Sequence, residues 1–311
     1  MKIFTGNAHP ALAESIASYL DMPLGKCEVF SFSNENVFVR FEENIRERDV
    51  FLVQPIVTPV NTRLMELFIM IDAAKRASAG RITAVVPYYG YGRSDKKDQP
   101  RVPITARLIA NFMETAGADR LLTIDLHAGQ IQGFFDIPVD NLFATPIFAR
   151  HIKKKLINKN LICVAPDVGG VERTRALARK LDIGIAIIDK RREGVNEAKA
   201  MNIIGDVKGK ICIVVDDMVD TAGTLLEATN ALIDAGAVEV HACCTHPVLS
   251  GPAHERIQGS ALSSLITTNT IPLKGDLKNN LKIKVLSIAP LLGEAILRIH
   301  KESSVSSLFH N

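Results

Sequence analysis

The sequence predicts an α/β protein with two halves, each a mainly parallel sheet flanked by helices. Its 311 residues are enough for two domains of ordinary size. Apolar runs typical of buried strands alternate with stretches of helical spacing. One sequence pattern also recurs: a predicted helix ends in Ala-Gly and an apolar strand follows. It occurs at Ala79-Gly80, Ala116-Gly117 and Ala235-Gly236. This alternation favours parallel sheets, whose ligands bind beyond the carboxyl ends of the strands.

The individual elements follow in chain order. Residues 49–57 form an apolar, β-branched run and predict a buried strand. A helix is predicted next from the apolar positions Leu64, Leu67, Phe68 and Ile71. We expect Gly80 to close that helix. Further strands are predicted at 81–87, 121–124, 161–165, 211–215 and 238–244, and residues 185–188 form another apolar run. A later helix has one apolar face made of Leu225, Ala228 and Leu232.

The domain boundary is predicted near residues 141–146. Segments 116–127 and 235–246 both contain Ala-Gly-Ala, an apolar strand and then His, which indicates two related halves. We expect a first domain of residues 1–142, joined by the tail 297–311, and a second domain of residues 143–296. The Ser-rich end of the tail is either disordered or docked on the first domain.

Composition excludes several classes of protein. The chain is 47% apolar and 23% charged, has a net charge of +3 and contains no Trp, so neither a nucleic-acid surface nor a base-stacking platform is indicated. No apolar run is long enough to span a membrane. The five cysteines include no C-x-x-C pair, which indicates reduced thiols in a cytoplasmic protein; they are Cys27, Cys163, Cys212, Cys243 and Cys244.

The most informative stretch is VVDDMVDTAGT, residues 214–224, which joins a predicted strand to a predicted helix. The first N–H groups of a helix lack partners within the helix and attract a phosphate. Thr221 and Thr224 add hydroxyl donors, and Gly223 allows a close approach of the backbone. The helix start therefore predicts an anion site.

Two carboxylates, Asp216 and Asp217, lie in the same stretch. Because carboxylates repel a phosphate, we expect them to bind sugar hydroxyls, and a phosphate beside two hydroxyls describes a phosphorylated ribose. The alternative is a capped helix after an acidic turn. The string resembles the phosphoribosyl-binding motif that phosphoribosyltransferases and phosphoribosyl-diphosphate synthetases share, and it does not separate the two.

Other stretches resemble the class I ribose-phosphate pyrophosphokinases specifically, and the similarity covers essentially the whole chain. They are NTRLMEL at 61–67, ASAGRITAVV at 77–86, TIDLHAGQIQGFFDIPVD at 123–140, MNIIG at 201–205 and CCTHPVLSGP at 243–252. The resemblance implies two phosphoribosyltransferase-like domains. It also implies transfer of the β,γ-diphosphoryl group of Mg²⁺·ATP to the C1 hydroxyl of ribose 5-phosphate, with release of AMP.

The resemblance assigns roles to residues of the second domain. Lys190 and Arg192 match the family's catalytic loop, although Glu193-Gly194-Val195 departs from the common Pro-containing version. The ribose 5-phosphate site is implied at Arg192, Asp216, Asp217, Asp220, Thr221, Ala222, Gly223 and Thr224. The diphosphate turn is implied at Asp167, Gly169 and Gly170. Magnesium is implied at His127 and Asp167, for which simple strand-end caps are the alternative.

ATP is expected at scattered side chains, because the sequence has neither a Walker A pattern nor a dinucleotide fingerprint. The basic loop 88–107 suits a triphosphate, although such a run is also typical of a solvated surface. The resemblance implies ATP contacts at Arg93, Ser94, Asp95 and Lys96. It implies an adenine segment, supplied to a neighbouring subunit, at Phe32, Asn34 and Asn36. Ser94 stands where the family usually has Gln, and Asn36 where it commonly has an acid.

The resemblance further implies a homohexamer that responds to inorganic phosphate and ADP. The matching allosteric surface includes Arg46, Arg48, Ser78, Arg81, Ser304 and Ser306. No nucleic-acid or membrane partner is expected. Two alternatives stay open on the sequence: a phosphoribosyltransferase, and a non-catalytic regulatory homologue of the synthetase. The presence of every implied catalytic group argues against the second.

Overall fold

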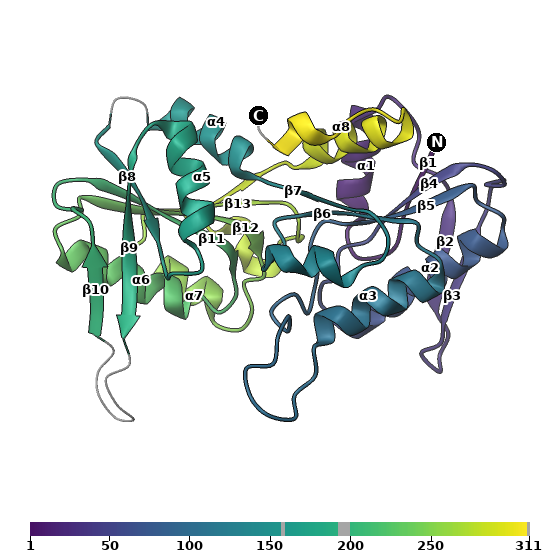
Figure 1. Ribbon diagram of the computed structural model, residues 1–311, viewed down its shortest axis with the longest axis horizontal. Helices are drawn as coiled ribbons and strands as arrows, with labels where there is room; N and C mark the ends of the chain where they lie inside the picture. The colour runs from purple at the N-terminus through teal and green to yellow at the C-terminus, as the bar shows by residue number, and fades with distance from the viewer. Residues whose placement is uncertain (157–158, 192–199, 310–311) are drawn as a thin grey trace. The chain divides into compact units, whose positions relative to one another are not determined.

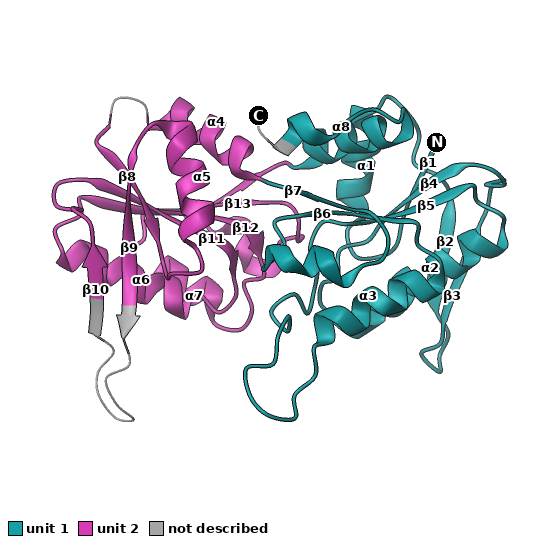
Figure 2. Cartoon of the chain, viewed as in Figure 1, with its two compact units in different colours: residues 1–143, 288–311 teal, residues 144–287 magenta. Residues whose placement is uncertain are grey.

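The computed structural model describes residues 1–156, 159–191 and 200–309 (Figure 1). Its contacts divide the chain into two compact units, shown in Figure 2. Unit 1 is Met1–Phe143 with Ile288–Asn311, and unit 2 is Ala144–Ser287. The returning segment therefore begins at Ile288, earlier than the residue 297 that the sequence led us to expect. A break at 297 would cut helix α8 (Ala289–His300), whose buried face already begins at Ala289.

Unit 1 has a five-stranded parallel sheet between two helical layers. The strand order is β1 (Lys2–Thr5), β4 (Asp49–Val53), β5 (Arg81–Val86), β6 (Arg120–Ile124) and β7 (Val139–Leu142). Helices α1 (Pro10–Tyr19) and α8 cover one face, and α2 (Val60–Arg76) and α3 (Thr105–Ala116) the other (Figure 1). The predicted apolar face of α2 is confirmed for Leu64, Leu67 and Ile71, which are buried, while Phe68 is partly buried against the same core.

Unit 2 has a seven-stranded sheet that is parallel except for its β10 edge. The order is β10 (Ala200–Ile204), β9 (Gly184–Arg191), β8 (Leu161–Ala165), β11 (Ile211–Val219), β12 (Glu239–Pro247), β13 (Ser264–Thr268) and β14 (Ile283–Leu286). Helices α4 (Thr145–Lys155) and α5 (Val171–Leu181) cover one face, and α6 (Gly223–Asp234) and α7 (Ala253–Gln258) the other (Figure 1). After β8 the chain forms β9 and β10 on one side of it, and then β11 to β14 on the other side. Strands β8 and β11 therefore flank a topological switch point.

The predicted Ala-Gly helix ends are confirmed twice. Gly117 after α3 and Gly236 after α6 have left-handed φ values of 117° and 91°. The prediction for Gly80 is wrong, because α2 ends at Arg76 and Ser78 takes the left-handed conformation with φ 59°. Gly80 instead lies against the backbone of Glu47, where a Cβ would come within 3.1 Å of a carbonyl. The absence of a side chain at Gly80 therefore allows the backbone of Glu47 to pack close to it.

Strands β11 and β12 run past their predicted ends, β12 to Pro247 instead of 244. Strand β11 runs to Val219 because it stays paired with β12 after β8 has ended, with Asp216 opposite Cys244. Asp216 and Asp217 therefore lie on the strand and not in the following loop. Strand β9 likewise extends to Arg191, paired with β10. In the opposite sense, the predicted strand 49–57 ends at Val53.

An antiparallel hairpin stands beside the unit 1 sheet, formed by β2 (Cys27–Ser31) and β3 (Val37–Phe41). Its inner side packs on the unit 1 core through Cys27, Val29, Val39 and Phe41. The Phe41 ring meets the Phe4 ring edge to face, with centroids 4.7 Å apart. The short 3-10 turns are η1 (Gly129–Phe134), η2 (Gly275–Asn279) and η3 (Ser306–Phe309). None of the helices in the described ranges has the length and apolar content that a membrane crossing needs.

We predict that Gly25→Ala destabilises unit 1. Gly25 donates its N–H to the Ile3 carbonyl at 2.8 Å, and an added Cβ would overlap the fully buried ring of Phe4. Overpacking of this kind costs about 1–3 kcal/mol of unfolding free energy. Urea denaturation of both variants measures it, with Gly133→Ala as the control because no atom lies within 4 Å of its added Cβ. Equal midpoints for the two variants would contradict the close contact.

Candidate active site

The carboxyl ends of adjacent strands in unit 2 bring the expected site residues that the structure describes in this unit to one edge of the sheet. Asp167 follows β8, and Asp216 and Asp217 lie near the end of β11, on the two sides of the switch point. Lys190 lies near the carboxyl end of β9, which runs parallel to β8. This is the edge at which parallel α/β sheets bind their ligands.

The acidic pair shares one cation, Arg173, from the first turn of α5. The Arg173 guanidinium lies 3.4 Å from an Asp216 oxygen and 3.3 Å from an Asp217 oxygen. Asp217 is buried, and its backbone N–H donates to Asp216 Oδ1 at 2.9 Å. Arg173 was not expected from the sequence, since only the fold brings α5 next to β11.

The pKa of Asp216 is raised to about 7. Burial is the main cause, followed by the charge of Asp217, and the positive charge of Arg173 opposes both effects. The raised pKa means that burial and the charge of Asp217 together disfavour the ionised form of Asp216. Additional hydrogen-bond donors, such as vicinal hydroxyls, would favour the ionised form.

The predicted anion loop lies directly after β11. Ala222 takes a left-handed conformation, φ 63°, and caps α6. Thr221 and Thr224 are exposed on either side of it. Because the first N–H groups of α6 are not used within the helix, the loop offers an anion both backbone and hydroxyl donors.

The segment after β12 holds this loop in place. Ser250 donates its N–H to the Asp220 carbonyl at 3.1 Å and its hydroxyl to the Asp220 carboxylate. Arg256 of α7 donates to the Thr221 carbonyl at 3.0 Å. These contacts support the uncommon backbone conformation of Ala222. Neither Ser250 nor Arg256 was singled out from the sequence, although both lie in or just after a family-like stretch.

The predicted diphosphate turn joins β8 to α5. Asp167 is exposed, and one of its carboxylate oxygens accepts the Gly170 N–H at 2.9 Å. A Cβ on Gly169 would lie 3.3 Å from that oxygen, so the carboxylate and the turn are in close contact. Gly170 caps α5, the helix that also carries Arg173.

The two expected catalytic cations differ in what the structure describes. Lys190 lies within β9, opposite Met201 of β10, so it belongs to a strand and not to the loop after it. Arg192 lies outside the described residues. The catalytic role of both stays a prediction.

In unit 1, the expected adenine segment is the exposed turn of the hairpin. Phe32 is 50% exposed, and its ring contacts Phe30 and Phe38, with centroids 5.0 and 5.9 Å away. Asn34 accepts the Asn36 N–H at 3.2 Å. The supporting rings, Phe30 and Phe38, were not predicted. The turn therefore presents an aromatic surface bordered by amides.

The expected triphosphate loop follows β5. Arg93 and Lys96 are exposed and Asp95 is buried. Ser94 lies in a turn, where its N–H donates to the Tyr91 carbonyl at 2.9 Å. The start of the loop lies beside the exposed His127, since a Cβ on Gly92 would be 3.6 Å from His127 Cβ. Within residues 1–156, 159–191 and 200–309, no three His, Cys, Asp or Glu side chains gather as a metal centre.

The expected allosteric residues fall into three groups in unit 1. Arg46 donates to Ser78 Oγ at 3.3 Å, and the Arg48 carbonyl accepts the Gly80 N–H at 2.9 Å. Arg81 pairs with Asp49 and donates to the Ile299 carbonyl at 3.0 Å. In the tail, Ser304 Oγ accepts the Ser306 N–H at 3.2 Å. The structure joins the first pair, Arg46 and Ser78, directly.

Family models match both ends of the chain. Residues 1–117 match the N-terminal domain of ribose phosphate pyrophosphokinase, and residues 191–310 match the phosphoribosyl synthetase-associated domain.

Similar proteins cover the chain from end to end. A ribose-phosphate pyrophosphokinase of Clostridium perfringens is 55% identical, over 100% of this chain and 98% of that protein. Another, of Rhizobium meliloti, is 54% identical over 99% of this chain and 100% of that protein. The crystal structure of phosphoribosylpyrophosphate synthetase from Mycobacterium smegmatis is 43% identical, with a TM-score of 0.92 over 97% of this chain and 99% of that one.

The raised pKa of Asp216 predicts a pH-dependent stability. A carboxyl whose pKa is raised by folding contributes stability below its unfolded pKa, and that contribution is lost as the pH rises through about 7. We therefore expect Asp216→Asn to raise the unfolding free energy relative to the wild type at pH 8 more than at pH 5. Chemical denaturation at both values measures the difference, with the exposed Asp276→Asn as control. The same difference at pH 5 and pH 8 would contradict the assignment.

Proposed function

The chain belongs to the ribose-phosphate pyrophosphokinase family, and from that premise we propose the residues with which it makes 5-phospho-α-D-ribose 1-diphosphate. The reaction transfers the β,γ-diphosphoryl group of Mg²⁺·ATP to the C1 hydroxyl of ribose 5-phosphate and releases AMP. The proposal for the sugar site rests on the acidic pair Asp216 and Asp217, which contacts Arg173 and stands next to a helix start that suits a phosphate.

Ribose 5-phosphate occupies the carboxyl end of β11. Its phosphate binds Thr221, Thr224 and the first N–H groups of α6, because these groups lie at or just before the start of the helix that follows β11. Its two ring hydroxyls donate to Asp216 and Asp217, because burial and the charge of Asp217 disfavour the ionised form of Asp216, which hydrogen-bond donors would stabilise. The five residues from Asp220 to Thr224 follow the acidic pair closely, which matches the short distance between the phosphate and the hydroxyls of one ribose.

The transferring diphosphoryl group lies at the turn after β8, beside Gly169 and Gly170. Attack by the C1 hydroxyl on the β-phosphorus forms the new P–O bond and breaks the bond to the oxygen of AMP. Negative charge grows on the nonbridging oxygens, and Lys190 and Arg192 stabilise it. The position of Lys190 at the carboxyl end of β9, two strands from β11, supports this role.

Magnesium is the metal that we propose for the site, and Asp167 suits it. The Asp167 carboxylate is exposed, and one of its oxygens accepts the Gly170 N–H. Mg²⁺ is usually bound by one or two carboxylates together with phosphate oxygens and waters. The imidazole of His127 is a poorer partner for so hard a cation, but it is exposed beside the loop after β5. A magnesium ion bound at Asp167 would neutralise phosphate charge.

Unit 1 supplies the nucleotide contacts. Phe32, Asn34 and Asn36 bind adenine, with the exposed aromatic face of the hairpin as the support for stacking. Arg93, Ser94, Asp95 and Lys96 bind the phosphates. We propose further that the enzyme is a homohexamer in the cytoplasm that responds to phosphate and ADP. Its effector surface would include Arg46, Arg48, Ser78, Arg81, Ser304 and Ser306, and contact between Arg46 and Ser78 supports that surface.

Phosphorus NMR of purified protein with ribose 5-phosphate, ATP and magnesium tests the reaction. We expect AMP and phosphoribosyl diphosphate in equal amounts, and neither when the sugar phosphate is left out. Formation of ADP and a singly phosphorylated sugar would contradict the reaction. No turnover, with or without inorganic phosphate, would instead identify a non-catalytic homologue.

We predict that Lys190→Ala lowers kcat by about a hundredfold or more, because a cation that stabilises the transferring group acts in the transition state. The dissociation constant of ribose 5-phosphate should change less than twofold, as measured by calorimetry. Lys153→Ala on α4 is the charge-matched control. An equal loss of turnover and of sugar-phosphate affinity would contradict the proposed role.

A further inference from the structure

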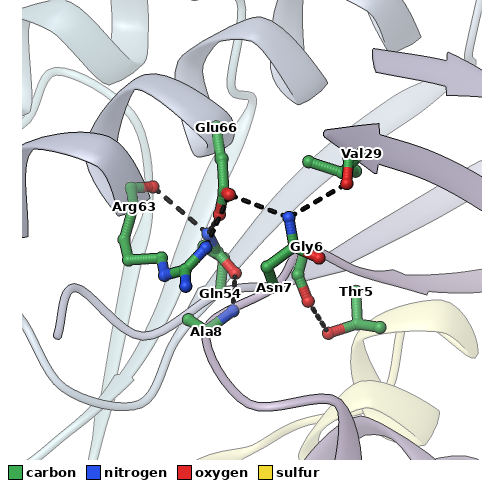
Figure 3. Close-up of polar contacts among 8 residues, drawn as sticks. All are labelled: Thr5, Gly6, Asn7, Ala8, Val29, Gln54, Arg63 and Glu66. Carbon is green, nitrogen blue, oxygen red and sulfur yellow. Dashed lines mark hydrogen bonds and ion pairs between the residues drawn. The ribbon is translucent and has the colours of Figure 1, made fainter. Parts of the chain in front are cut away.

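A buried carboxylate in unit 1 has no part in the reaction as described. Glu66 lies in the family-like stretch 61–67 at the start of α2 and is 2% exposed. It accepts three hydrogen bonds, from Asn7 Nδ2 at 2.8 Å, Gln54 Nε2 at 2.6 Å and Arg63 Nη1 at 2.6 Å (Figure 3). A buried charge is retained only with such partners, so the cluster has a defined geometry.

Gln54 connects this carboxylate to the ends of two strands. It is fully buried at the carboxyl end of β4. Its Nε2 also donates to the Arg63 carbonyl at 3.3 Å, and its Oε1 accepts the Ala8 N–H at 3.1 Å. Gly6 has no room for a side chain, because a Cβ there would lie 2.5 Å from Gln54 Oε1. The segment after β1 is therefore held against the end of β4.

Asn7 extends the cluster to the hairpin. Its Nδ2 donates both to Glu66 and, at 3.0 Å, to the carbonyl of Val29 on β2 (Figure 3). Asn7 itself is exposed, so it bridges the buried carboxylate and a strand at the surface. Val29 precedes Phe32 by only three residues.

A directed polar bond matters here because the other contacts of the hairpin are apolar. Val29, Val39 and Phe41 pack on the core, and such contacts attract without fixing direction. The hydrogen bond from Asn7 to the Glu66 carboxylate is stronger than a bond between neutral groups, and it is more directional than an apolar contact. The bond to the Val29 carbonyl therefore connects β2 to Glu66 of α2 through Asn7.

The same helix start also contacts the loop after β5. Asn61 accepts a hydrogen bond from the Tyr91 hydroxyl at 2.8 Å. The first two turns of α2 thus touch both segments to which we assign ATP contacts.

We propose that Glu66 and Asn7 are positioning residues for the nucleotide: Glu66 orients the Asn7 amide, and Asn7 sets the position of the hairpin that presents Phe32, Asn34 and Asn36. This inference rests on the proposed function. It assigns the 61–67 stretch a role in ATP binding without a contact to ATP.

Steady-state kinetics of Asn7→Ala and Asn7→Asp test the proposal, because an exposed residue can be changed without loss of the fold. We expect each variant to raise KM for ATP about tenfold, with kcat and KM for ribose 5-phosphate changed less than twofold. Asp has the shape of Asn but cannot donate and repels Glu66, so it should be at least as harmful as Ala. Asn111→Ala, an exposed Asn of α3, is the matched control.

Amide hydrogen exchange of the same variants gives a second readout. We expect faster exchange confined to residues 27–41, with the melting temperature within about 2 °C of the wild type. Wild-type-like KM for ATP in Asn7→Asp would overturn the proposal. So would a rise of both KM values together with faster exchange throughout unit 1, which marks general destabilisation. Failure of the proposed function is distinguishable, because the wild type would then form no phosphoribosyl diphosphate.

Discussion

The interaction on which the site depends is the contact of one guanidinium with two adjacent carboxylates at the end of β11. Asp216 and Asp217 are desolvated side by side, and Arg173 offsets only part of their repulsion. The arrangement holds because β8 and β11 flank the switch point, so that α5, which follows β8, starts beside the end of β11. We propose that the hydroxyls of the sugar bind this acidic pair, and that the start of α6, a few residues further along the chain, binds the phosphate.

We propose different arrangements of the binding groups in the two units. In unit 2 they lie at the carboxyl ends of parallel strands, and Ser250 and Arg256 hydrogen-bond to the loop after β11. In unit 1 they lie on the exposed turn of the antiparallel hairpin and on the loop after β5, and the hairpin is connected through Asn7 to the buried Glu66. In unit 1 the groups proposed to bind ligand are thus mostly exposed, and the cluster that holds the hairpin is centred on a buried carboxylate.

The sequence predicted the features that are local in the chain. The alternation of strands and helices, the left-handed glycines after α3 and α6, and the apolar face of α6 follow from spacing and side-chain chemistry, and the structure confirms them. The resemblance to the family supplied most functional residues, and full-length relatives confirm the family. Features set by tertiary neighbours were missed. Strand β11 is long because β12 continues beside it, and α8 joins unit 1 because its buried face begins at Ala289. Arg173 has no signal at short range, since Asp216 and Asp217 lie more than forty residues away along the chain. The Glu66 cluster likewise depends on Asn7, which is 59 residues from Glu66.

The release of protons when ribose 5-phosphate binds is the most direct test that the sugar hydroxyls contact Asp216 and Asp217. Burial and the charge of Asp217 raise the pKa of Asp216, so part of this carboxyl is protonated near neutral pH. Hydroxyl donors from ribose 5-phosphate should drive it to the ionised form. Calorimetry of ribose 5-phosphate binding, in buffers of different ionisation enthalpy, counts the protons released. We expect the wild type to release more protons on binding than Asp216→Asn does, a comparison that cancels the ionisation of the phosphate itself. Equal release by the two proteins would show that the sugar does not meet the acidic pair, and would contradict the account.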